Sequence, residues 1–171
     1  MKKRFKAVTV FFACVGVVLA VVAIGAALLL GRNDKAVTLD GPAMSPTIST
    51  GQKVRYVPYA TDQKPQRGDI ILYTQSSTAS KNKALIHRIT GVPGDRVTIS
   101  NGKVTVFNSQ HPNGFSPDAT YLKDDVITAG ESDVTLSPGA YFVLGDNRSN
   151  SLDSRIFGPI QLSSIIGRVE L

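Results

Sequence analysis

The distribution of apolar residues divides the chain into two unequal parts. Residues 7–30 form a run of 24 positions without a charged side chain, and apart from one threonine and two glycines all of them are hydrophobic. As an α-helix such a run is roughly 36 Å long, which exceeds the ~30 Å of a hydrocarbon core. The pattern predicts an uncleaved transmembrane helix. A cleaved signal peptide is the alternative, but its apolar stretch covers only ~7–15 residues and ends at a small-x-small site.

Beyond residue 31 the apolar residues occur in short runs typical of β-strands. These runs are rich in β-branched and aromatic side chains and are bounded by Gly, Pro, Asn or Asp. Asn101-Gly102 separates two of them and predicts a hairpin with a type I′ turn. Because no 12-residue helical pattern follows residue 31, we expect a mainly β fold, either a sandwich or an open barrel. The expected strands are residues 54–57, 69–73, 84–89, 96–99, 103–107 and 140–144.

Two polar stretches interrupt this series of strands. Residues 75–80 are polar without periodicity, which predicts a flexible loop between two strands. Residues 108–139 scatter Asn, Ser, Pro, Gly and Asp among weak strand patterns. We expect the second stretch to be an irregular excursion or a small subdomain inserted into the main β unit.

The charges are distributed as unevenly as the apolar residues. The 171-residue chain has 19 Lys and Arg against 13 Asp and Glu, for a net charge of +6. Four of the basic residues precede the apolar run, which leaves 15 basic residues against 13 acidic ones in the rest of the chain. This near balance argues against a nucleic-acid partner. By the positive-inside rule we expect residues 1–6 in the cytoplasm, residues 7–30 as a single-pass anchor in the lipid bilayer, and residues 31–171 outside.

Cysteine and histidine usage restricts the chemistry of the exported part. The only cysteine, Cys14, lies within the apolar run, so residues 31–171 have no disulfide framework and no thiol nucleophile. His87 and His111 are the only histidines, and no cluster has the spacing of metal ligands. We therefore expect neither a metal nor another cofactor.

Four segments combine turn-forming and charged residues beside the expected strands. Each taken alone is compatible with a structural turn or a solvated salt-bridge network. Their order and spacing are more informative than any one of them. They are residues 41–47 (GPAMSPT), 67–69 (RGD), 87–96 (HRITGVPGDR) and 145–155 (GDNRSNSLDSR).

Together these segments and the N-terminal anchor resemble the type I signal peptidases over essentially the whole chain. The resemblance follows the family's G-P-S-M-x-P-T, R-G-D, K-R-x-x-G-x-P-G-D and G-D-N-R-x-x-S-x-D-S-R motifs. It implies a membrane-anchored serine protease that removes signal peptides from exported preproteins. It also implies a signal-peptidase-type β core with a small β subdomain inserted near residues 100–140.

The two positions that carry the family's reaction differ in this chain. In the family, a Ser nucleophile loses its proton to a neutral Lys, whose pKa must be lowered by desolvation. The Ser position is Ala43 here and the Lys position is His87. Histidine occurs at this place in the archaeal and endoplasmic-reticulum branch and suits a general base near neutral pH. Alanine has no oxygen that could attack a carbonyl, so the missing nucleophile is the more serious loss.

The resemblance implies supporting and binding roles for further residues. Asp146, Asp153 and Arg155 would form a buried polar network, Ser151 would hydrogen-bond the residue at the base position, and Arg148 would brace the loop. Arg88 would support the site from the position after His87. The backbone near Gly41 and Ala43 would supply the oxyanion hole, and an extended substrate would add to strand edges. The substrate-binding residues would be Gly41, Met44 and Ile86.

Three hypotheses about function remain open from the sequence. We favour a signal-peptidase-like protein with a degenerate site that binds exported preproteins or pilin-like surface proteins as extended strands and assists their assembly. The second is an active serine endopeptidase in which the serine was removed by engineering or is replaced by Ser45, although Ser45 is shifted by ~6–7 Å along an extended chain. The third is a non-catalytic, membrane-tethered structural β module.

Overall fold

The computed structural model describes residues 21–22, 35–77, 80–117, 122 and 126–171. The chain divides into two compact units, residues 1–34 and residues 35–171. Apart from residues 21–22, the predicted membrane span lies outside the described residues. Among the residues that are described, no helix has the length and apolarity to cross a bilayer.

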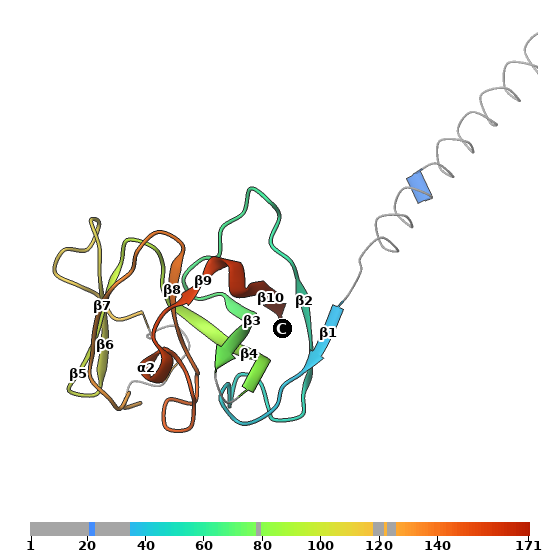
Figure 1. Cartoon of the computed structure of the whole chain (residues 1–171), viewed down its shortest axis with the longest axis horizontal. Coiled ribbons are helices and arrows are strands. Elements are labelled where there is room, and N and C mark those ends of the chain that lie inside the picture. The colour runs from blue at the N-terminus through green and yellow to red at the C-terminus, as the bar shows by residue number, and fades with distance from the viewer. Residues whose placement is uncertain (1–20, 23–34, 78–79, 118–121, 123–125) are drawn as a thin grey trace, which may run out of the picture. The chain divides into compact units, whose positions relative to one another are not determined.

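Residues 35–171 are built mainly from antiparallel strands, as predicted (Figure 1). The larger sheet has seven strands in the order β1-β2-β10-β3-β4-β8-β9, so β1 lies at one edge. Strand β8, Ala-Tyr-Phe-Val-Leu, has all five residues buried and runs between β4 and β9. The strands of this sheet are β1 (Lys35–Thr38), β2 (Lys53–Val57), β3 (Ile70–Ser77), β4 (Ser80–Gly91), β8 (Ala140–Leu144), β9 (Ile160–Gln161) and β10 (Ile165–Glu170).

The smaller sheet has three strands in the order β6-β5-β7. They are β5 (Arg96–Ser100), β6 (Lys103–Phe107) and β7 (Ser132–Thr135). Asn101 and Gly102, at the tip of the β5-β6 hairpin, have φ values of 51° and 75°. Both central residues of a type I′ turn require positive φ, which confirms the predicted hairpin. Strand β5 also pairs with β7, so this sheet brings together residues from both ends of the 96–135 segment.

The predicted loop at residues 75–80 is wrong in most of its extent. Strand β3 continues to Ser77, and β4 begins again at Ser80. The backbone ladder between them includes Gln75 opposite Lys83 and Ser77 opposite Ser80. Backbone hydrogen bonds of a ladder do not depend on side-chain hydrophobicity, so a polar segment without alternation can still extend a hairpin.

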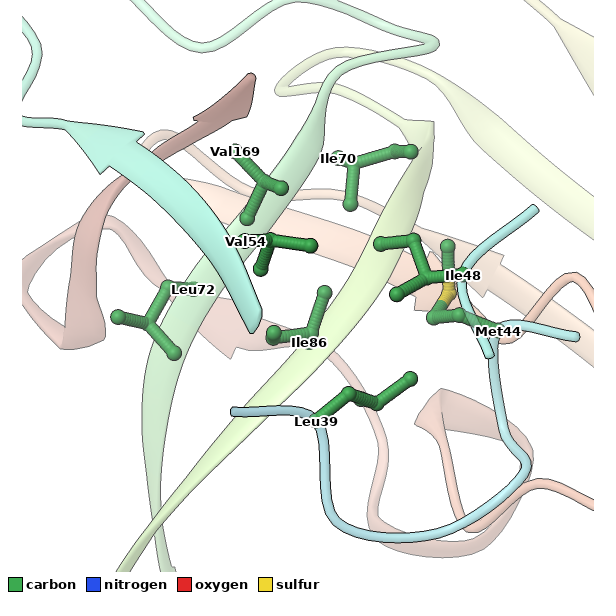
Figure 2. Packing of buried hydrophobic residues seen from close by; sticks show 8 residues of the cluster. All are labelled: Leu39, Met44, Ile48, Val54, Ile70, Leu72, Ile86 and Val169. Carbon is green, nitrogen blue, oxygen red and sulfur yellow. The ribbon is translucent and has the colours of Figure 1, made fainter. Parts of the chain in front are cut away.

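The apolar residues of residues 35–171 pack in three clusters, one of which lies directly beneath the segment with the GPAMSPT motif. In Figure 2 the side chains of this cluster converge from the larger sheet and from residues 39–48. Its buried members are Leu39, Met44, Ile48, Val54, Ile70, Leu72, Ile86 and Val169. Within residues 35–171, the described part contains one α-helix, the four-residue α2 (Ser154–Phe157), and a 3-10 turn, η1 (Leu162–Ser164), precedes β10.

Candidate functional site

The segment that carries Ala43 is a compact loop between β1 and β2. Two backbone hydrogen bonds close it, from Leu39 N–H to the Gln52 carbonyl and from Gly51 N–H to the Leu39 carbonyl, at 3.0 and 2.9 Å. Met44 and Ile48 are fully buried in the cluster below, and the Ile48 N–H bonds the Met44 carbonyl. The buried side chains and the backbone hydrogen bonds of this loop therefore fix the position of Ala43. Met44, which the sequence resemblance placed in substrate binding, contributes its side chain to the core instead.

The loop of residues 145–155 forms hydrogen bonds with the backbone of this segment. Asn147 N–H donates to the Ala43 carbonyl at 2.9 Å, and the Asn147 side-chain amide donates to the Pro42 carbonyl at 3.2 Å. A Cβ added to Gly145 would lie 2.5 Å from the Ala43 carbonyl oxygen and would collide with the Ser151 hydroxyl. Only glycine permits this close approach, so Gly145 brings the two segments into direct contact.

His87 is buried on β4, with 2% of its surface exposed. The Tyr73 hydroxyl lies 2.7 Å from His87 Nδ1, and the Ser151 hydroxyl lies 3.2 Å from His87 Nε2. Burial lowers the His87 pKa to about 4, although the negative charges of Asp153 and Asp146 act to raise it. The imidazole is therefore neutral at physiological pH, and both of its nitrogens are hydrogen-bonded.

Ala43 and His87 line the same small pocket, which offers about 30 Å³ of space for water-sized groups. One wall is formed by residues 37–40, at the end of β1 and just beyond it. Another wall is formed by residues 84–87 of β4, including Ile86, and Leu72 of β3 also lines the pocket. Most of these side chains are apolar, so the pocket suits a small apolar group.

Asp146 connects three parts of the site. Its carboxylate accepts two hydrogen bonds from Arg88, at 2.9 and 2.6 Å, and one from the Thr47 hydroxyl at 2.5 Å. Arg88 also donates to the Gly68 carbonyl, in the RGD turn. A buried ion pair is stable only when its remaining donors and acceptors are satisfied, and this one is. It links the strand of His87, the segment of Ala43 and the loop of residues 145–155.

Asp153 holds the other end of that loop. Its carboxylate accepts the Gly145 N–H at 3.0 Å and two hydrogen bonds from the Arg155 guanidinium, and it also caps α2. Burial raises the Asp153 pKa, but the hydrogen bonds from Arg155 and Gly145 outweigh this effect and the pKa lies below its usual value. Arg148 donates to the Gly145 carbonyl and to the Thr128 hydroxyl. The loop is thus fixed by charge-assisted hydrogen bonds.

The structure brings most of the sequence-predicted residues together. Ala43, His87 and Ile86 line the pocket, and hydrogen bonds of the charged residues expected to support the site connect the segment of Ala43 and the strand of His87 to the loop of residues 145–155. Gly41, at φ 96°, forms the bend before Ala43 and does not line this pocket, and neither does Ser45. Sequence reasoning missed Tyr73 as the partner of His87. Tyr73 is part of an ordinary strand pattern, and only the register that sets Ile71 opposite His87 brings it near.

These features define the class of the protein before any comparison. It is a mainly β protein in which a tight loop and a buried histidine line a pocket between two strands and are hydrogen-bonded to a charged loop.

Comparison with known proteins assigns the family. The family described as signal peptidase, peptidase S26, matches residues 7–171, and the chain belongs to it. The chain is 32% identical over 145 residues to signal peptidase IB of Staphylococcus aureus strain COL, which covers 77% of this chain and 73% of that protein. It is 31% identical over 146 residues to signal peptidase I of Bacillus caldolyticus, with 77% and 75% covered. A crystal structure of a signal peptidase I from Enterococcus faecalis V583 is 25% identical, with a TM-score of 0.47, covering 63% of this chain and 98% of that one.

Proposed function

We propose that this protein binds the processing region of exported preproteins without cleaving it, and that it assists the assembly of secreted, pilus or other surface proteins. Membership in the signal peptidase family supports exported preproteins as the substrate class. The observation that carries the proposal is that Ala43 presents a methyl group, and no hydroxyl, to an otherwise organised pocket.

The two walls of the pocket support binding of an extended segment. Strand β1 is the edge strand of its sheet and pairs only with β2 among the described strands. Residues 84–87 of β4 pair with β3 on one side, whereas the pairing with β8 begins at Arg88. Both walls therefore offer backbone groups to an added strand, and the apolar pocket between them would accept a small side chain.

The site supports binding better than catalysis. Both nitrogens of His87 are already hydrogen-bonded, to Tyr73 and to Ser151. Ser45 lies beyond the buried Met44, and its N–H bonds the Pro42 carbonyl. Without a nucleophile, serine proteases retain only ~10³–10⁴-fold acceleration over water, whereas enzymes typically achieve ~10⁶-fold or more.

We further propose that residues 7–30 anchor the protein in the cell membrane by a single pass. The N-terminus would then be cytoplasmic, and the β domain would be extracellular. The uncharged run and the four preceding basic residues support this arrangement. It would hold the pocket on the side of the membrane where exported segments emerge.

A binding measurement tests the proposed function. The full chain in detergent micelles is titrated with an isotope-labelled peptide that carries an Ala-x-Ala segment, and with a pilin-type segment of equal length. We expect saturable binding that weakens roughly tenfold or more in Ala43→Leu, because the larger side chain fills the pocket. Ala60→Leu, at an exposed position, is the matched control and should bind as the unmodified chain does. If neither peptide binds, the structural-module hypothesis replaces the proposal.

A cleavage assay distinguishes binding from activity. We expect no product when the purified full chain is incubated with a preprotein, and none for Ala43→Ser between pH 5 and 8. Cleavage by the unmodified chain would contradict the proposal. Cleavage by Ala43→Ser alone, with an inflection at the His87 titration, would instead favour an active peptidase whose serine had been removed.

A further inference from the structure

Two arrangements of hydrogen atoms are compatible with the positions of Tyr73, His87 and Ser151. A neutral imidazole has one N–H donor and one acceptor nitrogen, and its partners decide which is which. In the first arrangement Tyr73 donates to Nδ1, and Nε2–H donates to Ser151. In the second Nδ1–H donates to Tyr73, and Ser151 donates to Nε2, as a serine does toward a general base.

The surroundings favour the first arrangement. Tyr73 is fully buried, and in the described part of the chain its hydroxyl hydrogen bonds only to His87. If Tyr73 accepted from His87, its own hydroxyl hydrogen would have no acceptor, which is costly inside a protein. The Ser151 hydroxyl is one of the groups that lower the Asp153 pKa, so its hydrogen is directed toward that carboxylate, which accepts but cannot donate. The Ser151 oxygen is then free to accept from His87.

In the first arrangement the hydrogens of the Tyr73 hydroxyl and of the imidazole each have an acceptor, and the Ser151 hydrogen is directed toward Asp153. The second arrangement leaves the tyrosine hydrogen without an acceptor and turns the Ser151 hydrogen away from Asp153. The groups that act on His87 from neighbouring elements are Tyr73 on β3, Asp146, Asp153 and Arg155. All three charged groups are in or next to the loop of residues 145–155.

We propose that Tyr73 is a positioning residue that fixes the Nε2–H tautomer of His87, so that His87 holds Ser151 as a hydrogen-bond donor instead of acting as a general base. Ser151 packs against Gly145, and this contact keeps the loop of residues 145–155 on the Ala43 backbone. The residue at the family's base position thus serves to shape the pocket. This consequence rests on the proposed binding function, but the tautomer itself does not.

The tautomer can be measured directly by long-range ¹H–¹⁵N correlation spectra of the full chain labelled at histidine. We expect His87 in the Nε2–H form from pH 5 to 8, with the Nδ1 resonance shifted by the bond from Tyr73. In Tyr73→Phe that resonance should move toward the value of a nitrogen without a hydrogen bond. Tyr141→Phe, which alters another buried tyrosine, should leave the His87 spectrum unchanged. His111 provides an internal reference because it is exposed.

An Nδ1–H tautomer in the unmodified chain would overturn the proposal, as would an unchanged Nδ1 resonance in Tyr73→Phe. The same Tyr73→Phe sample should bind the Ala-x-Ala peptide roughly tenfold more weakly, because one buried hydrogen bond that positions the loop is lost. Unchanged affinity in a variant whose Nδ1 resonance has moved would overturn the link to the pocket. If the unmodified chain binds no peptide but shows the Nε2–H tautomer, only the proposed function fails.

Discussion

The substitutions at positions 43 and 87 change chemistry in different ways. Ala43 lacks the hydroxyl oxygen that a serine would provide. His87 retains a titratable group, but the protein environment determines what that group can do. It is enclosed between Tyr73 and Ser151, and burial keeps it neutral.

Burial of His87 predicts a pH dependence of stability. The unfolded chain binds a proton at His87 with a pKa near 6.5, whereas the folded protein binds it only near pH 4. Between these values the unfolded state holds more protons, so the free energy of unfolding falls as the pH is lowered from about 6.5 to 4. The full loss is about 3 kcal/mol, since each pKa unit corresponds to ~1.4 kcal/mol.

Urea unfolding of the full chain in detergent, followed by tyrosine fluorescence because the chain has no Trp, measures this loss. His87→Gln is the comparison, because the acidic groups that also titrate are common to both proteins. We expect the free energy of unfolding of the unmodified chain to fall relative to that of His87→Gln as the pH is lowered from about 6.5 to 4. Parallel pH profiles would show that His87 is protonated equally in the folded and unfolded states.

At the scale of elements, the loop of residues 145–155 is the part that assembles the site. It contacts the segment of Ala43 through Asn147, the strand of His87 through Asp146 and Ser151, and α2 through Asp153. The motif was visible in the sequence, but its partners were not. A pattern of Asp and Arg indicates ion pairs, whereas which residues pair depends on the register of strands far apart in the chain.

The Asp146–Arg88 pair and the Asp133–Arg96 pair allow a matched test of burial. Both are two-point contacts between a carboxylate and a guanidinium. The side chains of the first pair are 1% and 11% exposed, and those of the second are 58% and 50% exposed. We expect Asp146→Asn to lower the free energy of unfolding by about 3 kcal/mol, because it leaves a buried guanidinium without its counter-charge.

Asp133→Asn should leave the free energy of unfolding almost unchanged, since solvent screens an exposed pair. Urea unfolding of both variants at pH 7 provides the measurement. Equal effects of the two substitutions would mean that Asp146 is not needed for the stability of the site. The Asp146 variant should also bind the peptide more weakly, because it lacks the carboxylate that accepts from both Arg88 and Thr47 and joins them to the loop of residues 145–155.

At the scale of the whole molecule, the charge distribution predicts the orientation in the membrane. The four basic residues before the apolar run account for four of the six units of net positive charge. Changing all four to Glu should reverse or abolish the predicted orientation, because cytoplasmic retention of the N-terminus depends on them. They are Lys2, Lys3, Arg4 and Lys6.

Digestion of intact cells by an added protease measures the orientation. The unmodified chain should lose its β domain to the protease, whereas the variant with four Glu residues should be protected. A second variant, in which four exposed basic residues of the β domain are changed to Glu, undergoes the same change in net charge and is the control. If the protease digests the β domain of the N-terminal variant as readily as that of the unmodified chain, the N-terminal charges do not set the orientation.

The sequence alone determined the features that depend on neighbouring residues. The mainly β class and the Asn101-Gly102 turn follow from local alternation and from the positive φ that each turn residue adopts. Family membership follows from motif order and is confirmed by the comparisons. The membrane span remains a prediction, because it lies almost entirely outside the described residues.

Only the tertiary structure decided what those motifs do. It brought Ala43 and His87 to one pocket and hydrogen-bonded both to the loop of residues 145–155, although more than 100 residues separate Ala43 from that loop. It also extended β3 and β4 through a polar stretch, because a backbone ladder forms without apolar side chains. Above all, it placed Tyr73 beside His87. Strand register and burial determine which nitrogen of an imidazole holds the proton, and neither can be derived from the residue type alone.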